Sequence, residues 1–293
     1  MYKLSIMIPT YKRTSSLKSC LDSIILCGKR RDFEIFIVID GHDKKIYSLI
    51  RRYSRRHPIR HFIQNHSGPA AARNLGLRKA RGEIIAFLDD DCVVGKDWIK
   101  RIIAAHRKYP QAIAGSIVPV KKNLISEFSQ GLEARASLRD GEIFYPSLVN
   151  NNSYRKSQLK GIKFNESFKL ASGEDVDFNM KLHKRGIKTR FVKDIVVYHS
   201  YKTSLFPFLG QQFRFGKSRP MLMRLSNDYP FRKKPFLIYT VKRLATPFLD
   251  PWLRLWYAML HRKRGWLLYL PLGYLQQAAY WCGFAAGLFR YAF

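Results

Sequence analysis

The fold is decided by EIIAFLDDDC, residues 83 to 92. Ile84 to Leu88 form a short, uninterrupted apolar run after Gly82, a pattern typical of a buried central strand. Three aspartates follow at its carboxyl end, the edge where open α/β sheets bind ligands. Crowded carboxylates repel one another unless cations compensate them, and oxygen ligands suit Mg²⁺ or Mn²⁺. The alternative is an acidic turn that caps a helix beginning near Asp97.

Buried runs and amphipathic segments alternate through the first 90 residues. Strands are expected at 3–9, 33–39, 59–64 and 84–88, with helices after the first three of them. This alternation of strand and helix predicts an α/β fold with a mostly parallel sheet and helices on both faces. The polar loops after the strands, 10–13, 40–43 and 89–91, should therefore converge on one crevice.

Length and cysteine content set broad limits on the protein. A chain of 293 residues is long enough for one large domain and an appendage. Its four cysteines lack a CxxC or zinc-type spacing, which suits a reducing compartment. The first nine residues lack the basic start and long apolar core of an export signal, so we expect no signal peptide.

The charge balance indicates an anionic partner. The formal net charge is +32 and the pI is near 10.2. Nucleic acid, phospholipid headgroups and phosphorylated substrates would all be attracted by such a chain. The sequence contains no zinc finger, RNP motif or continuous basic helix, so we expect no specific nucleic-acid partner.

An ordered set of motifs identifies a family. IPTYKR, IVIDGHD, GPAAARNLG and AFLDDD are followed by NNSYRKSQL, FNESFKLASGEDVDFNMKLHKRGIK and VVYHS. This order resembles the family 2 glycosyltransferases, whose fold is called GT-A, over roughly residues 3 to 217. The resemblance implies an inverting, metal-dependent transfer of a hexosyl group from a nucleotide sugar to an acceptor hydroxyl. It also implies a catalytic domain over residues 1–220, with a nucleotide-binding half at 1–92 and an acceptor half at 93–220.

The resemblance implies a donor site in the loops that follow the strands. Asp40 corresponds to the residue that binds the nucleobase, and a carboxylate can accept a hydrogen bond from uracil N3–H, which favours a UDP-sugar. The family pattern continues Asp-Gly-Ser, whereas Gly41 and His42 follow here. Arg73 would pair with Asp40 or with the diphosphate. The donor-binding positions are Pro9, Thr10, Tyr11, Arg13, Asp40, Arg73, Asp89 and Asp90.

The resemblance also implies a metal site. Asp89 and Asp91 match the outer residues of an Asp-any-Asp motif, although Asp90 makes this register ambiguous by one residue. His199, at the end of a later strand, corresponds to a third metal ligand in some members. We therefore expect Asp91, Asp89 and His199 to hold Mn²⁺ or Mg²⁺. A histidine at a strand end is also a common structural residue.

Glu174 and Asp175 open a helix that ends at Gly186. The resemblance implies that Asp175 is the general base for the acceptor hydroxyl, with Glu174 beside it in the catalytic pair. The alternative is an acidic first turn that complements the helix dipole. A helix N-terminus lowers the pKa of a carboxylate, whereas a base for an alcohol gains from a raised one.

The last part of the chain, residues 221–293, is basic and rich in aromatic residues. No charged residue occurs between 265 and 289, a stretch long enough to cross a bilayer as a helix. A proline, two glutamines and several aromatic residues within it fit an interfacial segment better. We expect this tail to bind an anionic membrane at the cytoplasmic face of the inner membrane; packing within a soluble core is the alternative. Membrane attachment suggests a lipid-linked or cell-envelope glycan as acceptor.

Two other classes of protein remain as alternatives. A non-catalytic nucleotide-sugar-binding or scaffold protein would keep its role after Asp175→Asn. A nucleic-acid-binding protein would bind DNA or RNA beyond the nonspecific attraction of a polycation.

Overall fold

The computed structural model describes residues 2–28, 32–133, 138–144, 148–168, 172–226, 246–260 and 265–291. The chain forms two compact units. The first comprises Met1–Val120 with Ala134–Ser200, and the second comprises Lys121–Glu133 with Tyr201–Phe293. The domain boundary expected at residue 220 falls inside a helix of the second unit, α7 (Leu205–Leu225).

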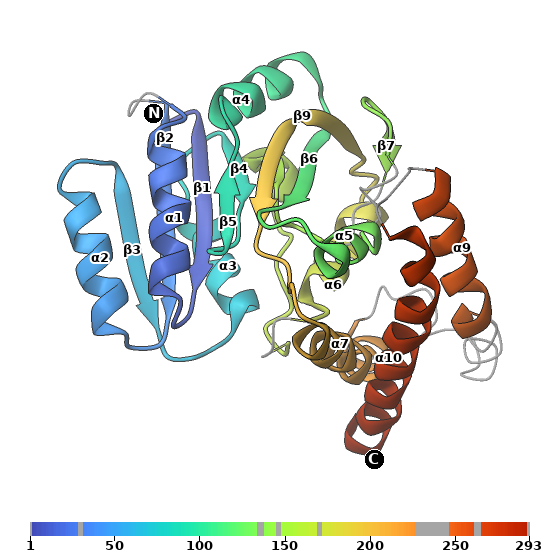
Figure 1. The fold of residues 1–293 in the computed structure, drawn as a ribbon. Helices are drawn as coiled ribbons and strands as arrows, with labels where there is room; N and C mark the ends of the chain where they lie inside the picture. Colours follow the sequence, from blue (N-terminus) through green and yellow to red (C-terminus); the bar gives the residue numbers. More distant parts are fainter. Residues whose placement is uncertain are drawn as a thin grey trace. The chain divides into compact units, whose positions relative to one another are not determined.

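A mixed sheet forms the centre of the first unit (Figure 1). Its strands follow the order β3-β2-β1-β4-β8-β6-β9-β5, and β7 pairs with β9. The strand bounds are β1 Leu4–Thr10, β2 Phe33–Asp40, β3 Ile59–Gln64, β4 Ile84–Phe87, β5 Cys92–Val94, β6 Ala112–Pro119, β7 Ile143–Phe144, β8 Asn152–Arg155 and β9 Thr189–His199. Strands β3, β2, β1 and β4 are parallel to one another, as are β6 and β9, whereas β8 is antiparallel to both its neighbours. The expected α/β fold with a mostly parallel sheet is confirmed.

Helices cover both faces of this sheet. The helices α1 (Thr14–Ile25), α2 (Lys44–Ser54) and α4 (Trp98–Lys108) share one apolar core with Ile35, Ile37 and Ile39 of β2. Side chains that alternate with these along β2, Phe36 and Val38, join α3 (Pro69–Lys79) and α6 (Glu174–Lys184) in the other core. All eight residues of β2 are buried, as expected of a strand covered on both faces.

The strand order creates a ligand crevice. After β1 the chain adds β2 and β3 on one side, whereas β4 lies on the other side of β1. The loops that follow β1 and β4 therefore meet at a topological switch point, where open α/β sheets bind ligands. These loops carry Thr10 to Arg13 and Asp89 to Asp91, as the sequence predicts.

The second unit is helical. Its elements are α5 (Leu124–Gly131), α7, α9 (Thr246–Leu260), the 3₁₀ turn η3 (Trp266–Leu268) and α10 (Tyr269–Tyr291). The backbones of α7 and α10 approach closely at glycines: a Cβ on Gly216 would lie 1.9 Å from the Tyr280 carbonyl oxygen, and one on Gly283 would lie 2.0 Å from that of Phe213. Among the described residues, no helix combines the length and hydropathy that a bilayer span requires.

Candidate active site

The three aspartates after β4 point to different partners. Asp90 is buried, where Thr10 Oγ1 donates a 2.7 Å hydrogen bond to Oδ2 and Arg13 Nη1 lies 3.2 Å from Oδ1. Burial raises the pKa of Asp90 to about 6, in spite of these two partners. Asp90 therefore ties the loop after β1 to the loop after β4, and Asp89 and Asp91 flank it. The assignment of Asp89 and Asp91 as the outer pair of the motif stays a prediction.

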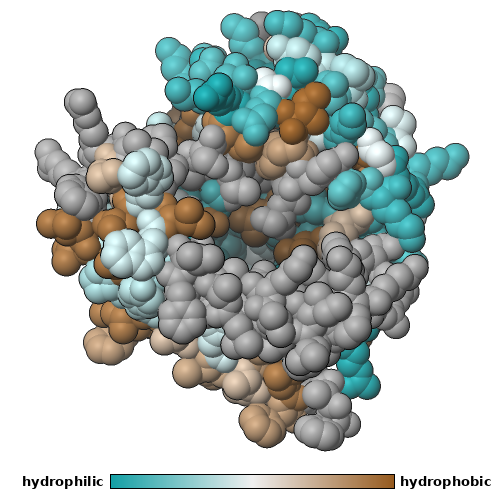
Figure 2. Space-filling model, turned by 90° about the vertical axis from the view of Figure 1, so that its right-hand side faces the viewer, coloured by the Kyte–Doolittle hydropathy of each residue, from teal (hydrophilic) through white to brown (hydrophobic). Residues whose placement is uncertain are grey.

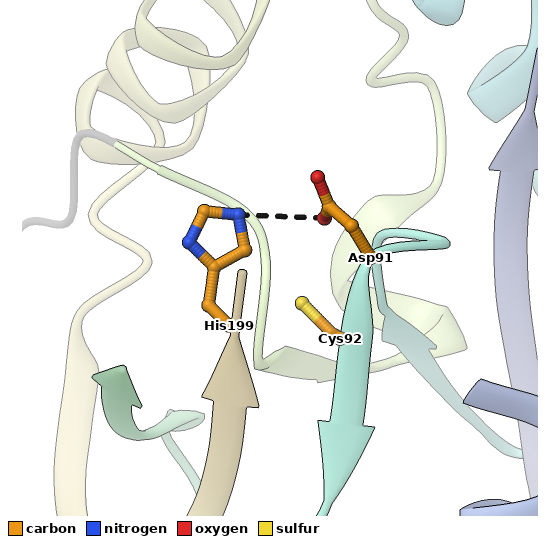
Figure 3. A group of neighbouring side chains, drawn as sticks. All are labelled: Asp91, Cys92 and His199. Atoms are coloured by element: carbon orange, nitrogen blue, oxygen red, sulfur yellow. Dashed lines mark ion pairs between the residues drawn. The ribbon is translucent and has the colours of Figure 1, made fainter. Parts of the chain in front are cut away.

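Asp91 lies beside the end of β9. Strand pairing places Cys92 of β5 opposite His199, and Asp91 Oδ1 lies 3.3 Å from His199 Nε2 (Figure 3). Arg13 Nη1 approaches Asp91 Oδ2 to 2.6 Å. Burial would raise the pKa of Asp91, but His199 and Arg13 hold it below its usual range. Two residues that are far apart in the sequence thus form one carboxylate–imidazole pair.

The Asp91–His199 pair fits a divalent cation. A ligand atom from each of Asp91, Cys92 and His199 lies within 4.8 Å of the others. Carboxylate and imidazole are ordinary ligands for Mn²⁺, whereas burial raises the pKa of the Cys92 thiol well above its usual value and disfavours the thiolate. Asp89, which the sequence also predicts as a metal ligand, forms an ion pair with Arg73 in this structure, and its role as a ligand stays a prediction.

Arg73 joins the two halves of the site. It is buried, with Nη2 3.1 Å from Asp89 Oδ1 and Nη1 2.9 Å from Glu174 Oε1 and 3.0 Å from Asp175 Oδ1. Burial would lower the pKa of Arg73, but the three carboxylates raise it above its usual value, so the guanidinium stays charged. The alternative in which Arg73 pairs with Asp40 is not observed. Its actual partners lie up to about a hundred residues away in the sequence.

Glu174 and Asp175 open α6 as predicted. Gly173 precedes them with φ +97°, a conformation that favours glycine. Burial and the neighbouring Asp175 raise the pKa of Glu174 to about 7, against the effect of Arg73. At Glu174 burial therefore raises the pKa by more than the helix N-terminus lowers it. The Asp175 side chain is the more accessible of the two, at 15 % exposure against 4 %, which suits it to receive a proton from an acceptor.

The site has an excess of negative charge. Five carboxylates form ion pairs with two arginines at this edge of the sheet. The carboxylates belong to Asp89, Asp90, Asp91, Glu174 and Asp175, and the arginines are Arg13 and Arg73. Two guanidinium groups cannot neutralise five ionised carboxylates, so the edge attracts a further cation unless some carboxyls stay protonated.

Asp40 organises the turn into α3. Its carboxylate accepts hydrogen bonds from Gln64 Nε2 at 2.8 Å, from the Ser67 amide at 2.7 Å and from the Gly68 amide at 3.0 Å. His66 Nδ1 lies 3.3 Å from the same carboxylate. A nucleobase N–H would therefore have to share or displace one of these contacts. His66 is 67 % exposed and is the contact most readily exchanged.

Tyr11 and His66 stack on each other, with ring centroids 4.5 Å apart. The sequence predicts Tyr11 as a donor-binding residue but gives no role to His66, Gln64 or Cys92. His66 lies just before Gly68 and Pro69, in a loop that the sequence does predict. Its contact with Tyr11 could not be predicted, because the two residues are 55 positions apart in the sequence. Pro9, another predicted donor residue, lies within β1 opposite Val38.

Known proteins resemble this chain in sequence. The family described as Glycosyl transferase family 2 matches residues 5–171. An uncharacterized glycosyltransferase of Rickettsia felis is 39 % identical over 98 residues, which cover 33 % of this chain and 16 % of that protein. The chain thus matches about a sixth of the length of that relative. The GalNAc(5)-diNAcBac-PP-undecaprenol beta-1,3-glucosyltransferase of Campylobacter jejuni is 26 % identical over 249 residues, covering 80 % of this chain and 79 % of the relative.

Solved structures agree on the fold. The mannosyltransferase PcManGT of Pyrobaculum calidifontis, in complex with GDP-Man and Mn²⁺, has a TM-score of 0.67 at 17 % identity, over 98 % of this chain and 87 % of that one. Residues 1–349 of TarS from S. aureus give 0.59 at 17 % identity, over 99 % and 92 %. The chain has the GT-A fold and belongs to glycosyl transferase family 2.

Proposed function

We propose that the chain is an inverting glycosyltransferase that moves a hexosyl group from a nucleotide sugar to an acceptor hydroxyl. The observation that carries this proposal is the buried Arg73, which holds Asp89 of the donor half against Glu174 and Asp175. Arg73 contacts both Asp175, the proposed base, and Asp89, in a loop that would bind the donor. This arrangement would hold the acceptor hydroxyl close to the nucleotide sugar.

In the proposed reaction Asp175 takes the proton of the acceptor hydroxyl. The acceptor oxygen forms a bond to the anomeric carbon as the bond from that carbon to the diphosphate oxygen breaks. The nucleoside diphosphate leaves with the electron pair, and a single displacement inverts the configuration. Glu174 and Arg73 position Asp175. A divalent cation held by Asp91 and His199 would neutralise charge on the diphosphate.

We favour a UDP-sugar as donor. Solved structures of TarS include complexes with UDP and with UDP-GlcNAc, whereas the Pyrobaculum mannosyltransferase was solved with GDP-Man. The buried Asp40 supports this choice because its carboxylate can accept the N3–H of uracil if His66 gives way. Tyr11 and His66 offer aromatic faces to the same base.

The test is release of nucleoside diphosphate from a panel of nucleotide sugars with an acceptor extract. Asp175→Asn should reduce turnover by roughly 10² to 10⁴-fold and leave UDP binding unchanged. Asp194→Asn is the matched control, because it makes the same change in charge at an exposed carboxylate of the same unit. If Asp175→Asn keeps full turnover, Asp175 is not the base. If no nucleotide binds, the chain is not a transferase of this kind.

The cation is tested separately by titrating UDP into the protein with and without Mn²⁺. Binding should tighten with Mn²⁺, and Asp91→Ala should remove that gain because it deletes the carboxylate that faces His199. Asp89→Ala distinguishes the two outer aspartates. A metal-dependent gain that survives Asp91→Ala would exclude Asp91 as a ligand.

We propose further that the second unit binds an anionic membrane from the cytoplasmic side. On α9, Trp252 and Trp256 lie one helical turn apart and are 55 % and 58 % exposed, with Leu253 between them at 65 %. The adjoining turn exposes Leu267 and Leu268. Hydrophobic side chains also reach the surface on the face drawn in Figure 2. Exposed tryptophans are typical of segments that lie at a membrane interface.

Membrane contact supports a lipid-linked or cell-envelope glycan as acceptor, as in the relative named for an undecaprenol-linked glycan. Flotation with phosphatidylglycerol and phosphatidylcholine vesicles tests the contact. Trp252→Gln/Trp256→Gln should reduce binding to anionic vesicles at least tenfold. The control Tyr47→Gln/Tyr198→Gln removes two exposed aromatics of the first unit and should have no effect. Equal loss in both variants would contradict the proposal.

A further inference from the structure

A cavity lies at the opposite end of β4 from the aspartates. Its volume is about 1340 Å³ and it belongs wholly to the first unit. It opens beside the first residues of β4 and the segment that follows β8, whereas Asp89 to Asp91 follow the last residue of β4. Ligand pockets for small molecules measure about 300 to 1,000 Å³, so this cavity has room for a nucleotide or a lipid headgroup.

The wall of the cavity is strongly cationic. Seven lysines and arginines line it, against a single carboxylate, that of Glu83. These cations are Lys3, Arg78, Arg107, Arg155, Lys156, Lys160 and Lys163. His106 also lines the cavity, but burial and Arg155 lower its pKa to about 4, so it is neutral at physiological pH. The wall therefore attracts anions.

Of the seven cations, only Lys3 forms an ion pair with another described residue, Asp32. The side chains of Arg155 and Lys156 donate hydrogen bonds to backbone carbonyls, and the other four have no counter-charge in the described part of the chain. Arg78, Arg107, Lys160 and Lys163 form no ion pair with another described residue, in contrast to Arg13 and Arg73 at the other end of β4. Like charges gathered around one concavity repel one another. A bound anion would remove that repulsion.

The cationic wall is held in place by hydrogen bonds to backbone carbonyls. Arg155 donates to the carbonyl oxygens of His106 and Tyr109, and Lys156 Nζ donates to that of Ala80 at 2.7 Å. Arg185 Nη1 donates to the Lys160 carbonyl at 2.7 Å. The wall is therefore partly preorganised, which reduces the entropy lost on binding.

Apolar side chains also line the cavity. They are Leu77, Ile84, Ile85, Ile103, Leu159 and Ile162, four of which are buried. An inorganic ion would leave these side chains uncovered. An organic phosphate would place its anionic group against the cations and its carbon skeleton against apolar side chains.

We propose that this cavity binds an organic phosphate, at a site distinct from the donor and acceptor sites. The phosphate belongs either to a soluble nucleotide or to the headgroup of a membrane lipid, and both offer the same chemistry to the wall. The site does not depend on the proposed transferase activity, because none of its lining residues takes part in that chemistry.

The experiment measures binding of two probes to the full chain by calorimetry, at physiological salt and with the donor site saturated by UDP. The probes are ADP and dihexanoyl phosphatidylglycerol below its micellar concentration. Arg107→Gln/Lys160→Gln should weaken binding by roughly tenfold for each cation removed. The matched control, Lys44→Gln/Lys45→Gln on α2, makes the same change in charge on another surface of the unit and should bind as the wild type does.

The result distinguishes the two sources of the phosphate. Binding of ADP alone assigns a soluble nucleotide, and binding of the lipid alone assigns a headgroup. Acetylation of lysines should also be slowed by the bound probe at Lys156, Lys160 and Lys163, but not at Lys44. Binding of neither probe, or equal weakening in the variant and its control, overturns the proposal, whereas UDP binding that is unchanged in both variants leaves the transferase proposal intact.

Discussion

The two ends of β4 carry opposite charges in opposite settings. At the carboxyl end, five carboxylates are largely buried and share Arg13 and Arg73. At the amino end, cations surround a cavity, and several have no counter-charge among the described residues. Charges at the first end are fixed by partners within the protein, as catalysis requires. Charges at the amino end are available to a bound anion, which we propose to be an organic phosphate.

Removing Arg73 should have the largest effect, because three carboxylates would lose their cation in a buried place. We expect Arg73→Met to lower the free energy of unfolding by about 3 to 5 kcal/mol, measured by urea denaturation. The control is Arg101→Met, whose partner Asp194 is exposed, and which should cost less than about 1 kcal/mol. Similar losses in both variants would show that Arg73 is not the centre of the network.

Glu174 should make stability depend on pH. Its pKa is about 7 in the folded chain, above the usual 4.5, so between these values the folded chain holds a proton that the unfolded chain releases. The free energy of unfolding should therefore fall as pH rises from 4.5 to 7. Glu174→Gln should flatten this slope in denaturation measured across the window. An unchanged slope would assign the titration to another group.

Thr10 tests the bond between the loops after β1 and β4. Thr10→Val removes the 2.7 Å hydrogen bond to Asp90 in a buried place and should cost about 1 to 2 kcal/mol in the free energy of unfolding. Thr14→Val is the control, because its hydroxyl has no hydrogen-bond partner among the described residues. If only Thr10→Val lowers the free energy of unfolding, the hydrogen bond between Thr10 and Asp90 stabilises the fold. Equal losses in the two variants would contradict this role.

Lys160 should have the smallest effect on stability. Lys160→Gln removes an exposed cation without an ion-pair partner among the described residues, so the free energy of unfolding should change by less than about 0.5 kcal/mol. A clear loss in thermal or urea denaturation would mean that the amino end of β4 is structural after all. The cations at the amino end of β4 would then contribute to stability, as the ion pairs at its carboxyl end do.

Local patterns predict much of the first unit. Continuous apolar runs mark β1, β2 and β4, and Gly173 with Glu174 and Gly186 marks α6, because burial and capping depend on neighbours in the sequence. The short β8 was not predicted, since its residues gain their place only by pairing with β4 about 70 residues earlier. Helix α5 was not predicted either, although Asn123 caps it.

The sequence predicts which residues belong to the site, but it does not predict which of them contact one another. The motif order indicates Asp89, Asp91, Asp175 and His199, but the strand order places only the loops that follow β1 and β4 beside each other. The role of Arg73 between Asp89 and Glu174 depends on tertiary packing, and a single arginine in a chain with 53 lysines and arginines gives no local signal. The stacking of Tyr11 on His66 is likewise a contact between loops.

The place of β8 in the sheet has a consequence for synthesis on the ribosome. Strands β1 to β4 can pair as soon as they emerge, because each finds its partner among residues already made. The outer edge of β4 stays open until Asn152–Arg155 emerge and cover it. A nascent chain that has ended before that point presents an uncovered, apolar strand edge, which is the surface that chaperones protect and that aggregation exploits.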